Sequence, residues 1–160
     1  MPTTRCGIGY DAHRLAPGRK LFLGGVEIPH SLGLEGHSDA DVLSHAIADA
    51  LLGAIGERDI GHHFPNSDES IRGISSLAIL ERVGALMQTA GARTVNIDAT
   101  LLAEAPKISA HIDAMRSKIA GALRIDAMRV SIKATTNEGL GAIGRGEGMA
   151  AMAVASVEQD

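Results

Sequence analysis

Met149-Ala-Ala-Met-Ala-Val-Ala-Ser-Val157 constrains the fold most strongly, because this segment is apolar on both of the sides that a strand presents. Successive side chains of a strand point to opposite faces of its sheet, so this strand needs cover on both faces. A single layer of helices can cover only one face. The sequence therefore predicts a sheet with helices on one side and self-association of the chain through the other.

Further strands and helices are predicted on the N-terminal side of this stretch. Strands are expected at residues 4–11, 94–102 and 129–135, and Leu21–Leu23 and Val26–Ile28 flank Gly24-Gly25 as in a two-residue hairpin. Residue spacing predicts helices from Ser38 to Leu52, from Ser75 to Ala90 and from Pro106 to Leu123, with Ser38 as a cap and Pro106 in a first turn. Residues 29–37 and 57–73 are expected to be irregular. This order predicts an α/β fold of the α+β type: one domain, residues 1–160, forming a two-layer sandwich with helices on one face of a mixed sheet.

The composition excludes several classes of protein. A formal net charge of −4 without a basic run argues against a nucleic-acid-binding surface. One Tyr, two Phe and no Trp imply an aliphatic core and leave few rings on which a nucleobase could stack. Cys6 is alone, which excludes an intramolecular disulfide, and we expect it to fill the core in the first strand. No apolar run approaches about 18 residues and no targeting segment is visible, so we expect a cytoplasmic protein without membrane contact.

Two segments carry a candidate metal site, Gly9-Tyr-Asp-Ala-His13 and His37-Ser-Asp-Ala-Asp-Val-Leu-Ser-His45. Asp11 and His13, separated by one residue on an extended segment, project to the same face. His45, one turn into the following helix, would complete a set of one carboxylate and two imidazoles. Three protein ligands with a fourth position open are typical of a catalytic zinc site.

The predicted helix from Ser38 also carries a polar stripe of Asp41, His45 and Asp49 at positions i, i+4 and i+8. A solvated stripe is the alternative interpretation when this helix is considered alone. With the metal site, Asp41 or Asp49 would orient an imidazole or hold a substrate hydroxyl. His37-Ser38 at the predicted helix start would favour an anion, although Ser38 could instead only cap the helix.

A third candidate segment is Lys133-Ala-Thr-Thr-Asn-Glu138, which ends a predicted strand and precedes the glycine-rich residues 139–148. Thr135 and Thr136 can donate to phosphate oxygens, and Glu138 can hold a hard cation such as Mg²⁺. The glycine-rich run fits neither a Walker A motif nor a Rossmann fingerprint. A flexible connection between strands is the alternative interpretation.

Taken together, these segments resemble the 2-C-methyl-D-erythritol 2,4-cyclodiphosphate synthase family of the non-mevalonate isoprenoid pathway. The resemblance runs essentially end to end and is specific because the blocks occur in order at compatible spacing. The blocks are residues 9–13, 37–42 with His45, 59–61, 64–65 with Asp68, 105–107, 133–136 with Glu138, and 144–148.

The resemblance implies a homotrimer with active sites between adjacent subunits. The substrate would be the cytidine diphosphate adduct of methylerythritol 2-phosphate, and the products CMP and the cyclic diphosphate. Asp11, His13 and His45 would bind Zn²⁺, Glu138 and the substrate phosphates would bind Mg²⁺ or Mn²⁺, and His37 and Thr136 would steady the transition state. The resemblance also implies a cytidine pocket formed by Ala103, Glu104, Ala105, Pro106, Lys107, Ile108 and Ser109, and phosphate contacts from Thr135, Thr136, Asn137 and Glu138. The implied methylerythritol contacts are Asp59, Ile60, Gly61, Phe64, Pro65, Asn66, Ser67 and Asp68. Further implied substrate contacts are Asp11, His13, Ser38, Asp49, Ala142 and Arg145.

The implied chemistry needs no protein nucleophile, because the 2-phosphate of the substrate attacks its own β-phosphorus and CMP leaves. The obstacle is repulsion between anionic phosphates, which two cations and positioned donors reduce. Gly139 and Ala142 depart from the family, in which a larger basic and an aromatic side chain are expected there. That neighbourhood would face the trimer axis, where Arg145 could meet an isoprenoid diphosphate.

Two other functions are compatible with the same residues. A zinc phosphodiesterase would activate water at the open metal position and release a linear phosphate. A non-catalytic trimer would bind isoprenoid diphosphates through Arg145. His62-His63 is expected to lie on the surface and not to ligate the metal.

Overall fold

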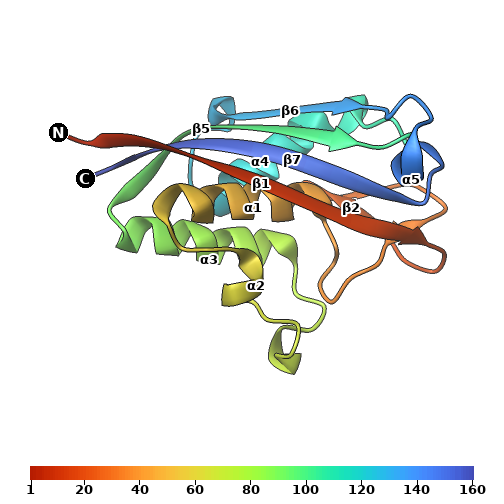
Figure 1. The fold of residues 1–160 in the computed structure, drawn as a ribbon, viewed down its shortest axis with the longest axis horizontal. Helices are drawn as coiled ribbons and strands as arrows, with labels where there is room; N and C mark the ends of the chain where they lie inside the picture. The colour runs from red at the N-terminus through yellow and green to blue at the C-terminus, as the bar shows by residue number, and fades with distance from the viewer.

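A five-stranded sheet with helices packed on one face forms the body of the computed structural model, which describes residues 1–160 (Figure 1). The strands are β1 Thr3–Ala16, β2 Leu21–Leu23, β3 Val26–Ile28, β4 Gly33–Leu34, β5 Ala92–Leu102, β6 Val130–Thr135 and β7 Gly148–Gln159. The helices are α1 Val42–Ile55, α2 Ile60–His63, α3 Ser76–Thr89, α4 Ile112–Leu123 and α5 Gly141–Gly144, with 3₁₀ turns at Glu69–Ile71, Ser109–His111 and Ala127–Arg129. None of the helices is long and apolar enough to span a membrane.

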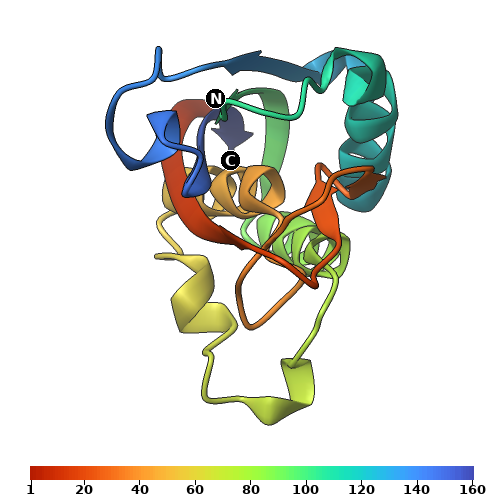
Figure 2. The same ribbon diagram turned by 90° about the vertical axis from the view of Figure 1, so that its right-hand side faces the viewer.

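The sheet is mixed, as predicted, with the strand order β4-β1-β7-β5-β6. The long strand β7 lies between β1 and β5 and is antiparallel to both, whereas β5 and β6 run parallel. The turned view in Figure 2 shows α1, α3 and α4 together on one side of the sheet. The predicted two-layer sandwich is therefore confirmed.

The separate hairpin of β2 and β3 also forms as predicted, with Leu21 opposite Ile28. Gly24 and Gly25 both have positive φ angles, of 58° and 75°. Such a pair is what a two-residue type I′ turn requires.

Helix α1 lies unusually close to β1. A Cβ atom on Gly9 would be 1.8 Å from the carbonyl oxygen of Ala46, and one on Gly7 would be 1.9 Å from that of Ala50. Because neither glycine has a side chain, the helix backbone rests almost directly on the strand. Helix α1 also packs against β7 and α3 (Figure 1). All but two of its residues are buried.

The other face of the sheet is open in the single chain and carries an apolar patch. Ile8, Tyr10, Met152 and Val154 are 67%, 60%, 44% and 49% exposed, and their strands place Ile8 opposite Val154 and Tyr10 opposite Met152. Cys6 belongs to the same exposed row of β1. The prediction that Cys6 fills the core was wrong, because even-numbered residues of β1 point away from the helices.

The first helix begins later than predicted. Ser38 does not cap it; Asp41 does, by accepting a hydrogen bond from the Ser44 amide at 3.1 Å. Ala40 has a φ of 56°, which interrupts any helix that starts at Ser38. The helix continues to Ile55 and ends at Gly56 in the left-handed conformation.

The predicted helix from Pro106 was also wrong at its start, because α4 begins at Ile112. The preceding residues are held against the end of β6 instead. The Ala103 amide donates to the carbonyl of Thr135 at 3.0 Å, and a carboxylate oxygen of Glu104 accepts from the Asn137 amide at 2.9 Å. Ile108 is buried at 2% exposure, which anchors the segment to the core.

We predict that Gly9→Ala lowers the free energy of unfolding by about 3 kcal/mol, because the new methyl group must displace the α1 backbone. The matched control is Gly121→Ala in α4, where no atom lies within 4 Å of the position that the new methyl group would take. The control should leave stability unchanged or raise it by about 0.5–1 kcal/mol. Urea unfolding of both variants checks this, and equal effects of the two substitutions would contradict it.

Candidate metal centre

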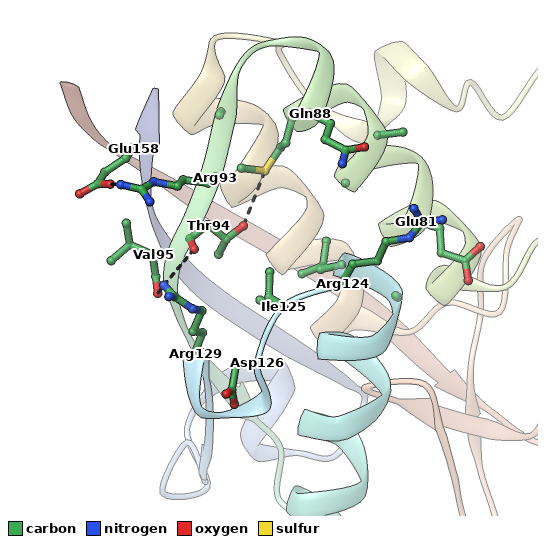
Figure 3. A pocket seen from close by; sticks show the side chains of 16 residues that line it. Glu81, Gln88, Arg93, Thr94, Val95, Arg124, Ile125, Asp126, Arg129 and Glu158 are labelled. Carbon is green, nitrogen blue, oxygen red and sulfur yellow. Dashed lines mark hydrogen bonds and ion pairs between the residues drawn. The ribbon is translucent and has the colours of Figure 1, made fainter. Parts of the chain in front are cut away.

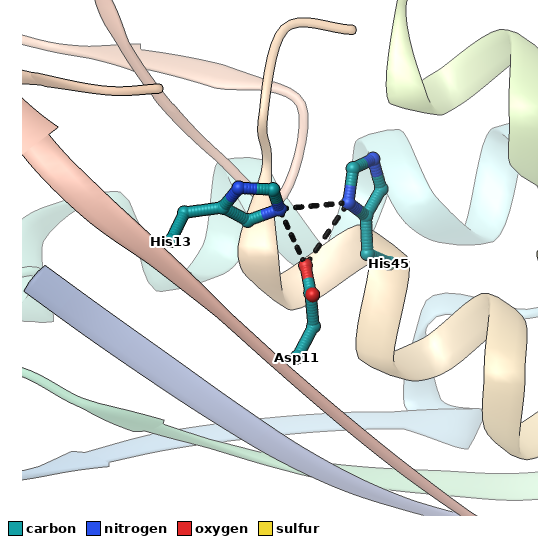
Figure 4. A group of neighbouring side chains, drawn as sticks. All are labelled: Asp11, His13 and His45. Atoms are coloured by element: carbon teal, nitrogen blue, oxygen red, sulfur yellow. Dashed lines mark hydrogen bonds and ion pairs between the residues drawn. The ribbon is translucent and has the colours of Figure 1, made fainter. Parts of the chain in front are cut away.

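Asp11, His13 and His45 meet at one point between β1 and α1 (Figure 4). Asp11 Oδ2 is 2.8 Å from His13 Nε2 and 3.0 Å from His45 Nδ1. The two ring nitrogens are 3.4 Å apart. The three side chains that the sequence predicted as metal ligands therefore do converge.

The local structure explains this convergence. Asp11 and His13 lie two residues apart on β1, so both point to the face that α1 covers. His45 lies in the first turn of α1 and is 6% exposed. The stripe on α1 is therefore not a solvated one, because α1 is enclosed between the sheet and α3.

The outer nitrogen of each imidazole has its own partner. His13 Nδ1 donates to the carbonyl oxygen of Glu35 at 2.6 Å, which leaves Nε2 without a proton in the neutral ring. His45 Nε2 lies 2.9 Å from Ser76 Oγ and 3.1 Å from Ser38 Oγ. These contacts turn the inner nitrogens of both rings toward the Asp11 carboxylate, as in metal sites whose histidines are oriented from outside.

The charge of Asp11 dominates the electrostatics of the cluster. Burial alone would raise the pKa of Asp11, but hydrogen bonds from His13 and His45 and their charges hold it well below the usual range. Burial likewise opposes the charged form of His13, but the hydrogen bond and charge of Asp11 outweigh it and raise the pKa of His13. The cluster therefore favours positive charge at its centre.

One carboxylate oxygen and two imidazole nitrogens form a donor set that suits Zn²⁺. When both rings are neutral and carry their protons on the outer nitrogens, the atoms that face one another all carry lone pairs and repel unless a cation lies among them. The raised pKa of His13 shows that a proton is favoured there without a metal, and a divalent metal ion could take its place. Three protein ligands leave room for a further ligand.

Asp41 has a different task from the one predicted. It is fully buried and accepts hydrogen bonds from the amides of Gly24 and Gly25, at 2.9 and 2.7 Å, and from the Ser44 hydroxyl at 2.7 Å. Burial, followed by the charge of Asp39, raises its pKa. Asp41 thus fastens the hairpin to α1 and neither orients an imidazole nor faces substrate.

Asp49, one turn beyond His45, ties α1 to α2. Its Oδ1 atom accepts from the Ile60 amide at 2.8 Å. Burial raises its pKa, against the effect of that hydrogen bond. It makes no hydrogen bond to either imidazole, so of its two predicted tasks only contact with a substrate hydroxyl is left open.

The predicted helix start at His37-Ser38 was wrong, because α1 begins at Val42 and its N-terminus is capped by the buried Asp41, so an anion near these residues would not meet free helix amides. These residues instead line a cavity of about 460 Å³ that also contains Arg19, Lys20 and Arg72. His37 Nε2 lies 3.4 Å from the carbonyl oxygen of Asp68. The cavity therefore borders the metal cluster through Ser38 and carries basic groups.

The other predicted site residues form two further groups. In the first, Asp59 caps α2 by accepting from the His62 amide at 2.9 Å, and Asp68 accepts from the Ser70 hydroxyl at 2.6 Å, which lowers the pKa of Asp68. In the second, Glu104 joins residues 103–109 to residues 135–139. Glu138 is exposed and is not among the clustered metal ligands. His63 contacts the Glu57 carbonyl oxygen at 2.7 Å, and neither it nor His62 joins the cluster.

A larger cavity of about 650 Å³ lies where β5 begins and β7 ends, between α3 and α4 (Figure 3). Some of its polar groups are paired with one another: Arg129 donates to the Val95 carbonyl oxygen at 2.9 Å, and Arg93 pairs with Glu158. It contains none of the residues predicted for the site.

Ser76 and Asp39 also lie at the cluster, although the sequence alone did not predict it. Ser75 caps α3, which leaves the adjacent and fully buried Ser76 without a capping task. A serine pair at the start of a helix was the available signal, but nothing in the sequence indicated that Ser76 contacts His45.

Comparison with known proteins gives consistent matches. Residues 4–158 match the YgbB family. The chain is 57% identical over 156 residues to the 2-C-methyl-D-erythritol 2,4-cyclodiphosphate synthase of Desulfosudis oleivorans, covering 98% of this chain and 93% of that protein. It is 57% identical over 155 residues to the synthase of the same name from Alkaliphilus metalliredigens, covering 97% and 98%.

Two solved structures extend this similarity to the fold. The bifunctional IspDF of Campylobacter jejuni superimposes with a TM-score of 0.95 at 38% identity, covering 100% of this chain and 43% of that longer one. The IspF of Plasmodium falciparum in complex with CDP superimposes with a TM-score of 0.86 at 32% identity, covering 98% and 97%.

We predict that the metal-free protein is more stable at about pH 6 than at about pH 8.5. A histidine with a raised folded-state pKa contributes stability that is fully present below its ordinary pKa and is lost as the pH rises through the raised value. His13→Gln should remove most of this difference, whereas His30→Gln, at an exposed position, should retain it. Denaturant unfolding of chelator-treated protein is the measurement, and an unchanged pH difference in His13→Gln would count against it.

Proposed function

The chain belongs to the YgbB family, and on that premise we propose that it acts as a 2-C-methyl-D-erythritol 2,4-cyclodiphosphate synthase. This phosphorus–oxygen lyase converts 4-diphosphocytidyl-2-C-methyl-D-erythritol 2-phosphate to the 2,4-cyclodiphosphate and CMP. The observation that carries the proposal is the Asp11, His13 and His45 cluster, found in a chain that matches such synthases over nearly its whole length. The CDP in the Plasmodium falciparum complex supports a cytidine nucleotide as substrate.

Asp11, His13 and His45 would hold Zn²⁺ between β1 and α1. When bound, this ion supplies a Lewis acid with about +1 net charge for a phosphate oxygen. The Glu35 carbonyl holds the His13 ring and the Ser76 hydroxyl holds the His45 ring, so that the inner nitrogens of both rings face Asp11. Burial of His45 keeps bulk water away from that side of the cluster.

The reaction itself proceeds within the substrate. The 2-phosphate attacks the β-phosphorus and CMP leaves, so the protein has to align anionic groups and reduce their repulsion. Thr135, Thr136 and Asn137 would contact the phosphates, and Glu138 would hold Mg²⁺ or Mn²⁺ with them. The Thr136 hydroxyl accepts from the Glu138 amide at 3.2 Å, which supports a defined turn in this segment. His37 and Thr136 would steady the transition state.

The remaining contacts follow from the two groups of residues outside the cluster. Glu104, by bracing residues 103–109 against residues 135–139, supports a shared pocket for cytidine and phosphates. The assigned cytidine residues are 103–109, and the assigned methylerythritol residues are 59–61 and 64–68, with Ser38 and Asp49 as further contacts.

The active form would be a homotrimer with its active sites between subunits. The exposed Ile8, Tyr10, Met152 and Val154 support self-association, because a single chain leaves this apolar face uncovered. Arg145, which pairs with Glu147 at 2.8 Å, would lie with Ala142 near the trimer axis and could meet an isoprenoid diphosphate there. The enzyme would act in the cytoplasm.

We predict that the zinc- and magnesium-loaded protein releases CMP and a cyclic diphosphate in equal amounts. Mass spectrometry of the product separates this outcome from phosphodiester hydrolysis, because hydrolysis adds one water and gives a linear product. A linear product would contradict the synthase assignment. Binding of prenyl diphosphates without CMP release would indicate a non-catalytic protein instead.

We predict that His45→Ala loses nearly all bound zinc and lowers turnover at least about 100-fold. Because His45 is buried, the substitution should also cost about 1–2 kcal/mol of stability. His62→Ala is the matched control, since His62 is exposed and lies outside the cluster. Elemental analysis gives the zinc content, and full zinc occupancy in His45→Ala would overturn the ligand assignment.

We predict that Glu138→Gln raises the Mg²⁺ or Mn²⁺ concentration needed for half-maximal turnover and leaves zinc content unchanged. Glu138 is not one of the three clustered ligands, so its loss should affect only the second cation. Glu81→Gln is the control carboxylate, because Glu81 is exposed and lines the cavity that contains none of the predicted site residues. A metal titration curve identical to that of the unsubstituted protein would exclude Glu138 as a ligand.

A further inference from the structure

A chain of hydrogen bonds runs from Asp39 through Ser76 to the outer nitrogen of His45. We propose that Asp39 and Ser76 are positioning residues that fix the tautomer of His45, so that its Nδ1 atom offers a lone pair to the metal ion. The inference rests on the metal site of the proposed function and adds two residues to it.

The first step concerns the proton of the Ser76 hydroxyl. Ser76 Oγ donates to Asp39 Oδ1, and the Ser76 amide donates to Asp39 Oδ2 at 2.9 Å. The Asp41 amide also donates to Asp39 Oδ1, at 3.1 Å. A carboxylate can only accept, so the Ser76 proton is committed to Asp39.

The second step concerns the ring of His45. Ser76 Oγ lies 2.9 Å from His45 Nε2 and, with its own proton directed to Asp39, presents only lone pairs there. Two lone pairs cannot face each other at that distance without repulsion. Nε2 therefore carries the proton, and in the neutral ring Nδ1 is the bare nitrogen that faces Asp11 Oδ2 at 3.0 Å.

Ser38 lies near the same nitrogen but cannot impose a tautomer. Its Oγ atom is 3.1 Å from His45 Nε2 and accepts from the Ala40 amide, also at 3.1 Å. Its own proton is not committed to any acceptor and can rotate to suit either state of the ring. Ser76 is therefore the group that fixes the tautomer of His45.

Burial makes this arrangement difficult to replace. Ser76 is fully buried and His45 nearly so, and every buried side-chain nitrogen and oxygen in the structure has a hydrogen-bond partner. Without the Ser76 hydroxyl, the remaining protein partner of Nε2 is Ser38 Oγ at 3.1 Å, which can donate or accept and so does not fix the tautomer. The first residue of α3 thereby holds in place a ligand that belongs to α1.

The test compares Ser76→Ala with Ser75→Ala in zinc-loaded protein. Ser75 caps the same helix by accepting from the Leu77 amide at 3.2 Å, but it is exposed and makes no contact with His45. We expect Ser76→Ala to raise the zinc dissociation constant about 10- to 100-fold in chelator competition, and Ser75→Ala to leave it unchanged. A general loosening of α3 would affect both variants equally.

The spectroscopic readout is the His45 Nε2–H signal in protein labelled with ¹⁵N at histidine. In zinc-loaded wild type we expect a slowly exchanging proton on Nε2, retained in Ser38→Ala and lost or rapidly exchanging in Ser76→Ala. Asp39→Asn keeps the shape of the side chain but replaces one acceptor oxygen with a donor, so it should weaken zinc binding in the same direction. Asp39→Asn also tests the proposal if Ser76→Ala fails to fold.

Three outcomes would overturn the proposal. The first is that Ser76→Ala and Asp39→Asn leave both the zinc affinity and the exchange rate of the Nε2 proton unchanged. The second is that Ser38→Ala alone loses the Nε2–H signal. The third is that Nε2 of His45 carries no proton in the wild type. In each case, zinc binding and turnover by the wild type would leave the proposed function standing. A wild type that binds no zinc would instead remove both.

Discussion

The near contact between α1 and β1 is the constraint on which the rest of the structure depends. Gly7 and Gly9 remove the two side chains that would hold the helix away, since a methyl group at Gly9 would overlap the Ala46 carbonyl at 1.8 Å. The helix therefore rests on the strand at backbone distance. His45 on the helix and Asp11 and His13 on the strand reach one another for this reason.

The cluster is built so that its inner atoms need a cation. Outer partners occupy the far side of each imidazole, the Glu35 carbonyl for His13 and the Ser76 hydroxyl for His45. The inner nitrogens then face the Asp11 carboxylate at 2.8 and 3.0 Å. A proton on His13 reduces the repulsion in the metal-free protein, and a divalent ion bound by the three side chains would reduce it as well.

The two faces of the sheet serve different purposes. The covered face carries the candidate metal ligands and the aliphatic core, in which alanines of β7 pack against α1. The open face is apolar over β1 and β7, where Ile8 and Val154 are exposed, and polar over β5 and β6, where Lys133 pairs with Asp98 at 2.5 Å. The apolar half of the open face supports association between copies of the chain, as the apolar segment Met149–Val157 predicted.

Periodicity and spacing within one element were enough to predict the strands, the main helices, the Gly24-Gly25 turn and the three candidate metal ligands. Tertiary structure alone decided that α1 starts at Val42, since Asp41 also accepts from the distant amides of Gly24 and Gly25. It likewise decided that His45 is buried, that Cys6 is exposed, and that Ser76 contacts His45. These properties depend on which face of a helix or strand contacts another element. That choice is made by contacts between residues far apart in the chain, which form only when the elements pack together.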